Sequence, residues 1–152
     1  MSDVEVLPGR LEEIVSDFEL CEGREKLELL LDYALSFPPF PERLQRPDSV
    51  DDVPECMTPV QMAAEAEDGH IDFYFDVPSE SPTVRGYAAL IMQGVNGLSA
   101  EDILKIPSDF YLRMGLQEVL TAQRMNGMAA ILAHVKRRAL QEMQAADQSE
   151  SG

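Results

Sequence analysis

The two cysteines, Cys21 and Cys56, carry the most specific chemistry in this sequence, because a thiolate is both a strong nucleophile and a soft metal ligand. They are 35 positions apart and form no Cys-x-x-Cys pair, so the sequence predicts neither a redox dithiol nor a disulfide framework. The two histidines, His70 and His134, occur in unrelated contexts, whereas structural zinc and iron–sulfur sites need about four ligands. We therefore predict reduced thiols and no metal or cofactor site.

Cys56 differs from Cys21 in its surroundings. It follows a segment without periodicity, residues 37–55, that contains five prolines, and it is flanked by Pro54 and Pro59. Long irregular segments in compact domains often carry function, so a reactive Cys56 is one interpretation. Most free cysteines are inert, so the residues alone favour an unreactive thiol slightly over a reactive one. Cys21 follows the apolar face of a predicted helix and is expected to be structural.

Other kinds of site have little support. The glycines form neither a Gly-x-Gly-x-x-Gly motif nor a P-loop, which argues against a nucleotide site. The many carboxylates contain no pair that can be distinguished from a solvated surface, so no hydrolytic role is assigned. No His or Asn partner is placed to activate a cysteine, which argues against an independent thiol enzyme.

The charge of the chain is strongly asymmetric. The formal net charge is −16, and residues 1–80 carry 21 acids against 5 bases while residues 81–152 carry 7 of each. A polyanionic surface repels nucleic acids and anionic membranes, so neither is an expected partner. A protein partner with a basic docking surface would be attracted, although the acids could equally serve only solubility.

The periodicity predicts one α+β domain over residues 1–152, with residues 1–8 and 145–152 frayed. We expect a small antiparallel sheet of about three strands packed against several helices. The first strand of the hairpin should be an edge strand or begin after Pro59, and Asp68-Gly69 predicts a hairpin turn. Apolar spacing predicts helices over residues 10–20 and over residues 27–34, the second ending before Pro38. Capping residues predict further helices from Ser81-Pro82 to Asn96-Gly97, from Ser99 to Pro107, and from Thr121 onward. A short helical turn is expected from Ser108 to Gly115.

The first residues lack a basic and apolar leader, and no segment has the length of apolar sequence that a membrane span requires. These features predict a cytoplasmic protein.

Several motifs occur in an order that resembles the SufE family over about residues 11–140. No single motif is specific, but their order and spacing together are. They are Leu30-Leu31-x-Tyr33, the proline-rich segment, Val53-Pro54-Glu55-Cys56-Met57-Thr58, the hairpin, Ser79-Glu80-Ser81-Pro82-Thr83-Val84-Arg85-Gly86, and Arg124-Met125-Asn126-Gly127.

The resemblance implies a function for Cys56. SufE-like proteins accept sulfur as a cysteine persulfide from a desulfurase and supply it to iron–sulfur cluster assembly. It implies that Cys56 is the acceptor. We expect Arg124, Glu80 and Arg85 to be supporting residues, although for Arg124 an ordinary role at the helix surface or cap is equally open. Pyridoxal phosphate would belong to the partner, a SufS-like cysteine desulfurase, and the recipient would be a SufBCD-like scaffold complex. The protein would then be a sulfur-transfer partner rather than a stand-alone enzyme.

This chain departs from many members of the family around the cysteine. Many have Gly before it and Ser-x-Val-Trp after it, whereas this chain has Glu55 before it and Thr58-Pro59-Val60-Gln61 after it. The alternative function is a binding module that stimulates a desulfurase without carrying sulfur. We expect Asp51, Asp52 and Glu55 to raise the pKa of the Cys56 thiol unless Arg85, Arg124 or an apolar recess offsets them.

Overall fold

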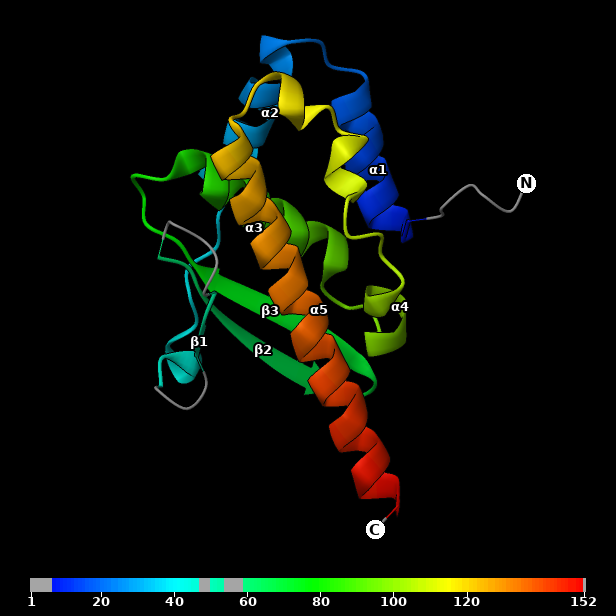
Figure 1. The fold of residues 1–152 in the computed structure, drawn as a ribbon. Helices are drawn as coiled ribbons and strands as arrows, with labels where there is room; N and C mark the ends of the chain where they lie inside the picture. The colour runs from blue at the N-terminus through cyan, green and yellow to red at the C-terminus, as the bar shows by residue number, and fades with distance from the viewer. Residues whose placement is uncertain (1–6, 47–49, 54–58, 152) are drawn as a thin grey trace, which may run out of the picture.

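The computed structural model describes residues 7–46, 50–53 and 59–151, with side chains described as far as residue 145. It confirms the predicted α+β class (Figure 1). The helices are α1 (Gly9–Glu19), α2 (Arg24–Leu35), α3 (Pro82–Val95), α4 (Ala100–Leu104) and α5 (Ala122–Ser151), with short 3₁₀ turns at Glu42–Leu44, Phe110–Leu112 and Leu116–Glu118; the strands are β1 (Asp51–Asp52), β2 (Gln61–Glu67) and β3 (His70–Asp76).

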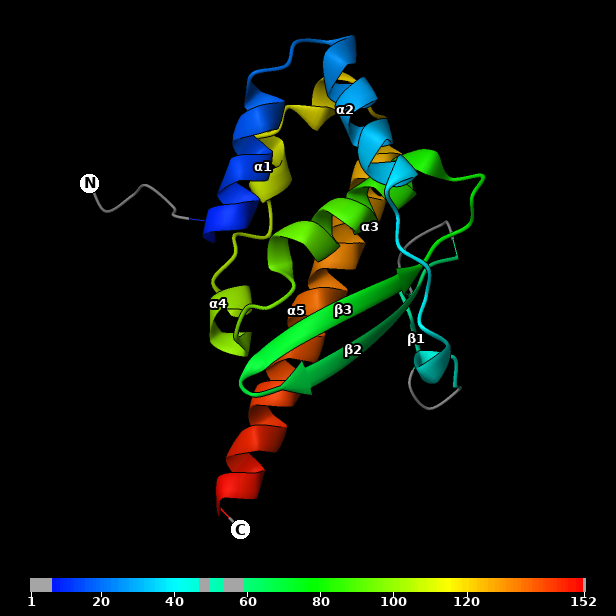
Figure 2. The same ribbon diagram turned by 180° about the vertical axis from the view of Figure 1, so that it is seen from behind.

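Helix α3 lies at the centre of the fold because its sequence is apolar on almost every face. It contacts α1, α2, α5 and β3, and Tyr87, Leu90 and Ile91 are fully buried. Burial raises the pKa of the Tyr87 phenol far above its usual range. Figures 1 and 2 show α5 crossing one face of the sheet, while α1 and α2 pack at the end of the molecule away from the hairpin turn.

The three strands form an antiparallel sheet in the order β1-β2-β3. The predicted hairpin turn is confirmed, since Asp68 and Gly69 both adopt positive φ values, 51° and 85°, as a two-residue turn of this type requires. Alternate residues of β3, including Phe73 and Phe75, are fully buried against the helices. The hairpin therefore supplies one wall of the hydrophobic core.

The residues that follow α3 form hydrogen bonds with the outer edge of β3, the edge that faces away from β2. The Asn96 side chain accepts a hydrogen bond from the Phe73 amide at 2.7 Å and donates one to the Phe73 carbonyl at 3.0 Å. The Ile71 amide donates to the Leu98 carbonyl, and the Gly97 amide donates to the Ile71 carbonyl. Asn96-Gly97 thus ends α3, as predicted, and also pairs with the sheet.

Some predictions of local structure need correction. We expected residues 145–152 to fray, but α5 continues to Ser151. Leu7 is buried, although the first eight residues were expected to fray. Ser108 caps no helix; its hydroxyl instead accepts a hydrogen bond from Lys136. Within the described residues, no helix is long and apolar enough to cross a membrane.

Gly86 sets the closest approach between α2 and α3. A Cβ atom at this position would lie 2.2 Å from the backbone oxygen of Leu30, a separation that real structures do not tolerate. The glycine of the Val84-Arg85-Gly86 motif therefore has a packing role. It lets the first turns of α3, which carry Arg85, lie directly against α2.

We predict that Gly86→Ala lowers the free energy of unfolding by about 1–3 kcal/mol, because the added methyl group forces two helix backbones apart. Equilibrium urea unfolding measures this change. Gly9→Ala is the matched control, since a Cβ atom there meets no atom within 4 Å, and it should leave stability unchanged or raise it. Equal stability of the Gly86→Ala and Gly9→Ala variants would contradict this explanation of the motif.

Candidate functional site

The predicted acceptor Cys56 lies outside the described residues, but the two points where its segment joins the fold are described. The Val53 amide donates a hydrogen bond of 3.0 Å to the Val60 carbonyl. Both valine side chains are buried, with 4% and 2% of their surface exposed. The chain therefore leaves the sheet at Val53 and returns beside it at Val60. We call this pair the base of the Cys56 segment.

The base lies next to the start of α3. Gln61 of β2 pairs with Asp76 of β3, which brings Val60 beside Val77. The Val77 carbonyl accepts a hydrogen bond of 2.6 Å from Arg85. The Arg85 guanidinium also lies over the ring of Phe37, with its central carbon 4.3 Å from the ring centroid. Arg85 thus joins the end of β3, the start of α3 and the proline-rich segment.

Arg124 joins α5 to the same end of α3. Its guanidinium donates a hydrogen bond of 2.6 Å to the hydroxyl of Thr83, whose side chain is buried. Its backbone amide donates to the Thr121 hydroxyl, which confirms Thr121 as the cap of α5. The buried Gly127 lies one helical turn further along. The structure thus brings two of the predicted supporting residues, Arg85 and Arg124, to the first turn of α3.

Glu80 is not part of this arrangement in the described structure. Its side chain is exposed, and among the residues that the structure describes its hydrogen bond comes from the hydroxyl of the neighbouring Ser79. It occupies the turn between β3 and α3, close in sequence to Arg85. No described contact links it to either arginine.

The acids closest to the base lie beside polar side chains of β2 and α5. The carboxylate of Asp51 lies 3.6 Å from Nε2 of His134 on α5, and this histidine side chain is only 11% exposed. The carboxylate of Asp52 accepts a hydrogen bond from the side-chain amide of Gln61 at 3.3 Å. Asp52 therefore helps to attach β1 to β2, and Asp51 lies next to α5.

A hollow opens beside the base on the side of the proline-rich segment. Its volume is about 580 Å³, and its lining includes Phe40, Arg46, Gln61 and Asp76. Gln61 directly follows Val60, so the hollow begins one residue from the base. It offers an aromatic ring, an amide, one positive charge and one negative charge to a visiting segment of chain.

The second thiol has a different setting. Cys21 follows α1, is partly exposed, and directs its sulfur toward the Asp17 carbonyl at 3.5 Å. This is the half-buried environment predicted for a structural cysteine. Across residues 7–46, 50–53 and 59–145, no group of three or more His, Cys, Asp or Glu side chains could hold a metal ion.

Sequence motifs pointed to the arginines but not to their partners. Thr83, Val77 and Phe37 were not singled out, because each matters only through a contact across the fold. The only sequence feature that could have indicated them is their position within or near the motifs that resemble the SufE family. Pairing between Val53 and Val60 was likewise not expected, since a proline-rich segment offers no strand pattern.

These features define a class of small α+β protein in which a cysteine-bearing segment is attached at the end of a three-stranded sheet. A family model described as Fe-S metabolism associated domain, SufE, matches residues 12–139. The chain belongs to the SufE family.

Known relatives agree with this assignment. An uncharacterized SufE-like protein of Mycobacterium tuberculosis is 40% identical over 133 residues, which cover 87% of this chain and 92% of that protein. SufE-like protein 1 of Arabidopsis thaliana, chloroplastic/mitochondrial, is 29% identical, and the match covers all of this chain but 41% of that protein. The solution structure of a hypothetical protein from Thermus thermophilus has a TM-score of 0.80 and 32% identity, with 91% of this chain and 99% of that chain covered.

We predict that Arg124 and Thr83 are energetically coupled. Arg124→Ala leaves the buried Thr83 hydroxyl without its donor, whereas Thr83→Val removes the hydroxyl and keeps the shape. The two substitutions together should destabilise less than the sum of the single effects, with a coupling of about 0.5–1.5 kcal/mol. Urea unfolding of the four proteins measures it. Strictly additive effects would show that this hydrogen bond does not connect α3 to α5 in solution.

Proposed function

We propose that this protein is a sulfur acceptor, in which the Cys56 thiol takes sulfur from a cysteine desulfurase and passes it on for iron–sulfur cluster assembly. Membership of the Fe-S metabolism associated family supports the proposal. The observation that carries it is the base of the Cys56 segment, where Val53 and Val60 are buried and hydrogen-bonded. Such a base fixes both ends of a thiol-bearing segment at one place on the fold.

The reach of the chain limits where the chemistry takes place. Cys56 lies three positions after Val53, and an extended chain spans at most about 3.6 Å per residue. Any reaction of the Cys56 thiol therefore takes place at this end of the sheet, near the starts of α3 and α5. This is the region that Arg85 and Arg124 connect.

The transfer step requires a thiolate and a persulfide but no external oxidant. The Cys56 thiolate attacks the outer sulfur of a persulfide on the desulfurase. The bond between the two donor sulfurs breaks, the donor cysteine leaves as a thiolate, and Cys56 becomes the persulfide. Pyridoxal phosphate in the desulfurase supplies the chemistry that releases sulfur from free cysteine. The thiols must stay reduced, which fits a reducing compartment such as the cytoplasm.

The charge distribution favours a partner with a basic surface. The excess of acids lies in the half of the chain that includes α1, α2, β1, the hairpin and the Cys56 segment. A positively charged desulfurase surface would be steered toward this half. The hollow beside Gln61 provides space for a segment of the donor protein next to the base.

We expect the Cys56 thiol to react slowly in the free protein and faster in the complex. Asp51 and Asp52 flank the base and disfavour a nearby anion, which opposes formation of a thiolate. A docked basic surface would compensate these charges. Slow reaction in the free protein would also protect the thiol against oxidation.

The decisive experiment is to incubate the protein with a cysteine desulfurase, pyridoxal phosphate and L-cysteine, and then to map added sulfur by mass spectrometry. The peptide that contains Cys56 should gain the mass of one sulfur atom. The Cys21→Ser protein should gain the same sulfur, and the Cys56→Ser protein should gain none. Alkylation of parallel samples should be slower for Cys56 without the desulfurase than with it.

Two outcomes would contradict the proposal. Sulfur found on Cys21, with Cys56 unmodified, would transfer the acceptor role to the other thiol. A Cys56→Ser protein that still supports full sulfur delivery would favour the alternative, a module that stimulates the desulfurase without carrying sulfur.

A further inference from the structure

Most of the outer edge of β2 has no strand beside it in the described structure. β1 pairs with β2 only through Asp51 with Met62 and Asp52 with Gln61. The remaining residues of β2, Ala63–Glu67, pair with β3 on their other side and with no described strand on this one. Figures 1 and 2 show β1 beside only the first part of β2. A sheet edge of this kind can accept a further strand.

The backbone groups available at this edge follow from the register. In β3, Ile71 and Phe73 direct their amide and carbonyl groups away from β2, toward residues 96–98. Opposite residues in an antiparallel pair point their backbone groups either toward each other or away from each other. The partners of Ile71 and Phe73 are Ala66 and Ala64. Both alanines therefore point an amide and a carbonyl outward.

These two alanines suit close approach by another chain. Ala66 is exposed and Ala64 is partly exposed, and a methyl side chain does not obstruct an incoming backbone. In the part of the chain that the structure describes, neither alanine uses its outward amide or carbonyl in a hydrogen bond. Four strong hydrogen-bonding groups are thus available in a row.

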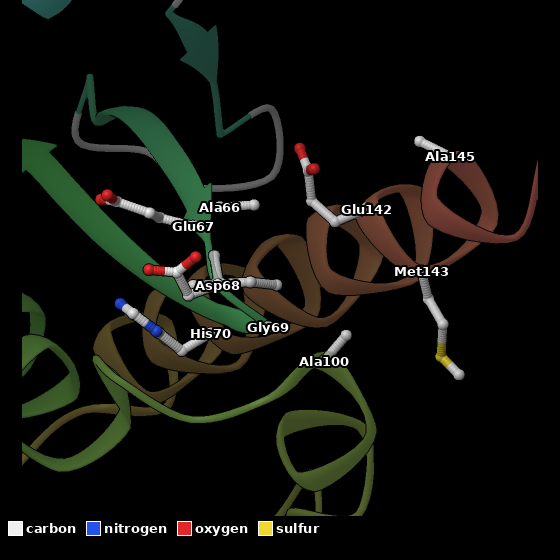
Figure 3. Close-up of a pocket in the computed structure, with 10 residues that line it drawn as sticks. Ala66, Glu67, Asp68, Gly69, His70, Ala100, Glu142, Met143 and Ala145 are labelled. Carbon is white, nitrogen blue, oxygen red and sulfur yellow. The ribbon is translucent and has the colours of Figure 1, made fainter. Parts of the chain in front are cut away.

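A cavity of about 380 Å³, lined by both apolar and ionisable side chains, lies beside the end of this edge. Figure 3 shows Ala66 of β2, Ala100 of α4 and Met143 of α5 contributing to its lining from three elements. A strand added next to Ala66 would bring alternate side chains to the face where this cavity opens. The cavity can therefore hold an apolar side chain of such a strand.

The residues around the edge are mainly acidic. Glu67 and Asp68 are exposed and form no ion pair with a described residue. Glu65 is paired with Arg43, whose hydrogen bonds hold the pKa of that carboxyl below its usual value. Glu142, which also lines the cavity, is paired with Arg138. The unpaired charge next to Ala66 is therefore negative.

We propose that the edge of β2 at Ala64–Glu67 docks an extended segment of a partner protein that carries lysine or arginine together with apolar residues. The segment forms a strand that pairs with β2 next to the end of β1. It places an apolar side chain in the cavity and its basic side chains near Glu67 and Asp68. A second copy of this chain fits less well, because two symmetry-related β2 edges would bring the same acids together. The proposal goes beyond the function given above and stands even if Cys56 carries no sulfur.

Amide hydrogen exchange, measured by NMR on the full chain, tests the proposal with a synthetic peptide. The probe is a capped heptapeptide that alternates lysine with valine or leucine, and its control replaces every lysine with glutamate. The basic peptide should slow exchange of the Ala64 and Ala66 amides by about tenfold or more when bound. The amides of Ala63 and Glu65, which face β3, should change little.

Two variants make the test specific. Ala66→Pro removes the outward amide without removing a hydrogen bond between β2 and β3, and should weaken peptide binding about tenfold or more. Ala66→Ser keeps the amide and is the matched control. Should Ala66→Pro fail to fold, the double variant Glu67→Lys and Asp68→Lys leaves the backbone intact and should weaken binding to a similar extent.

Several results would overturn the proposal. Protection of Ala64 and Ala66 in dilute protein without peptide would mean that the chain itself covers the edge. Protection that grows with protein concentration would identify a second copy as the occupant. Equal binding of the basic and acidic peptides, or binding that leaves these amides unaffected, would also contradict it.

Discussion

The hydrogen bond between the Val53 amide and the Val60 carbonyl is the interaction on which this structure's functional interpretation depends. Because both side chains are buried, the core holds the two ends of the Cys56 segment. The rest of the fold supports this point. β2 continues from it into the hairpin, and Val77 at the end of β3 leads from it to the start of α3. Arg85 and Arg124 then attach that start to β3 and α5.

The charge asymmetry acquires a structural meaning in this arrangement. The acidic half of the chain contains α1, α2, β1 and the hairpin with the open edge of β2, while the half without net charge supplies α3, α4 and α5. The acids therefore lie on the first two helices as well as on the sheet. A basic partner would be attracted to this half, which includes the ends of the Cys56 segment and the β2 edge.

Much of the fold could be predicted because the relevant signals are local. Apolar spacing identified α1, α2 and α3, Asp68-Gly69 identified the hairpin turn, and Ser99 capped α4 as expected, through a hydrogen bond from the Asp102 amide. Local signals were insufficient at the C-terminus. There a polar sequence suggested fraying, yet the helix continues to Ser151.

The candidate site was less accessible to sequence reasoning because its contacts join distant segments. Arg85 and Arg124 were expected from motifs, but neither Thr83 nor the Val77 carbonyl could be identified as a partner without the fold. Glu80 belongs to the same motif as Arg85, and it nevertheless contacts no other part of the described site. A two-residue strand such as β1 has no periodicity, so the base of the Cys56 segment could not be predicted.

Native-state hydrogen exchange of the Val53 amide tests the central claim most directly. If Val53 and Val60 hold the Cys56 segment as described, this amide should exchange about a hundredfold or more slowly than in an unstructured peptide, comparably to the Ile71 amide, which donates to Leu98. Exchange of Val53 at the rate of an unstructured chain, while Ile71 remains protected, would show that the segment has no fixed base and would contradict the claim.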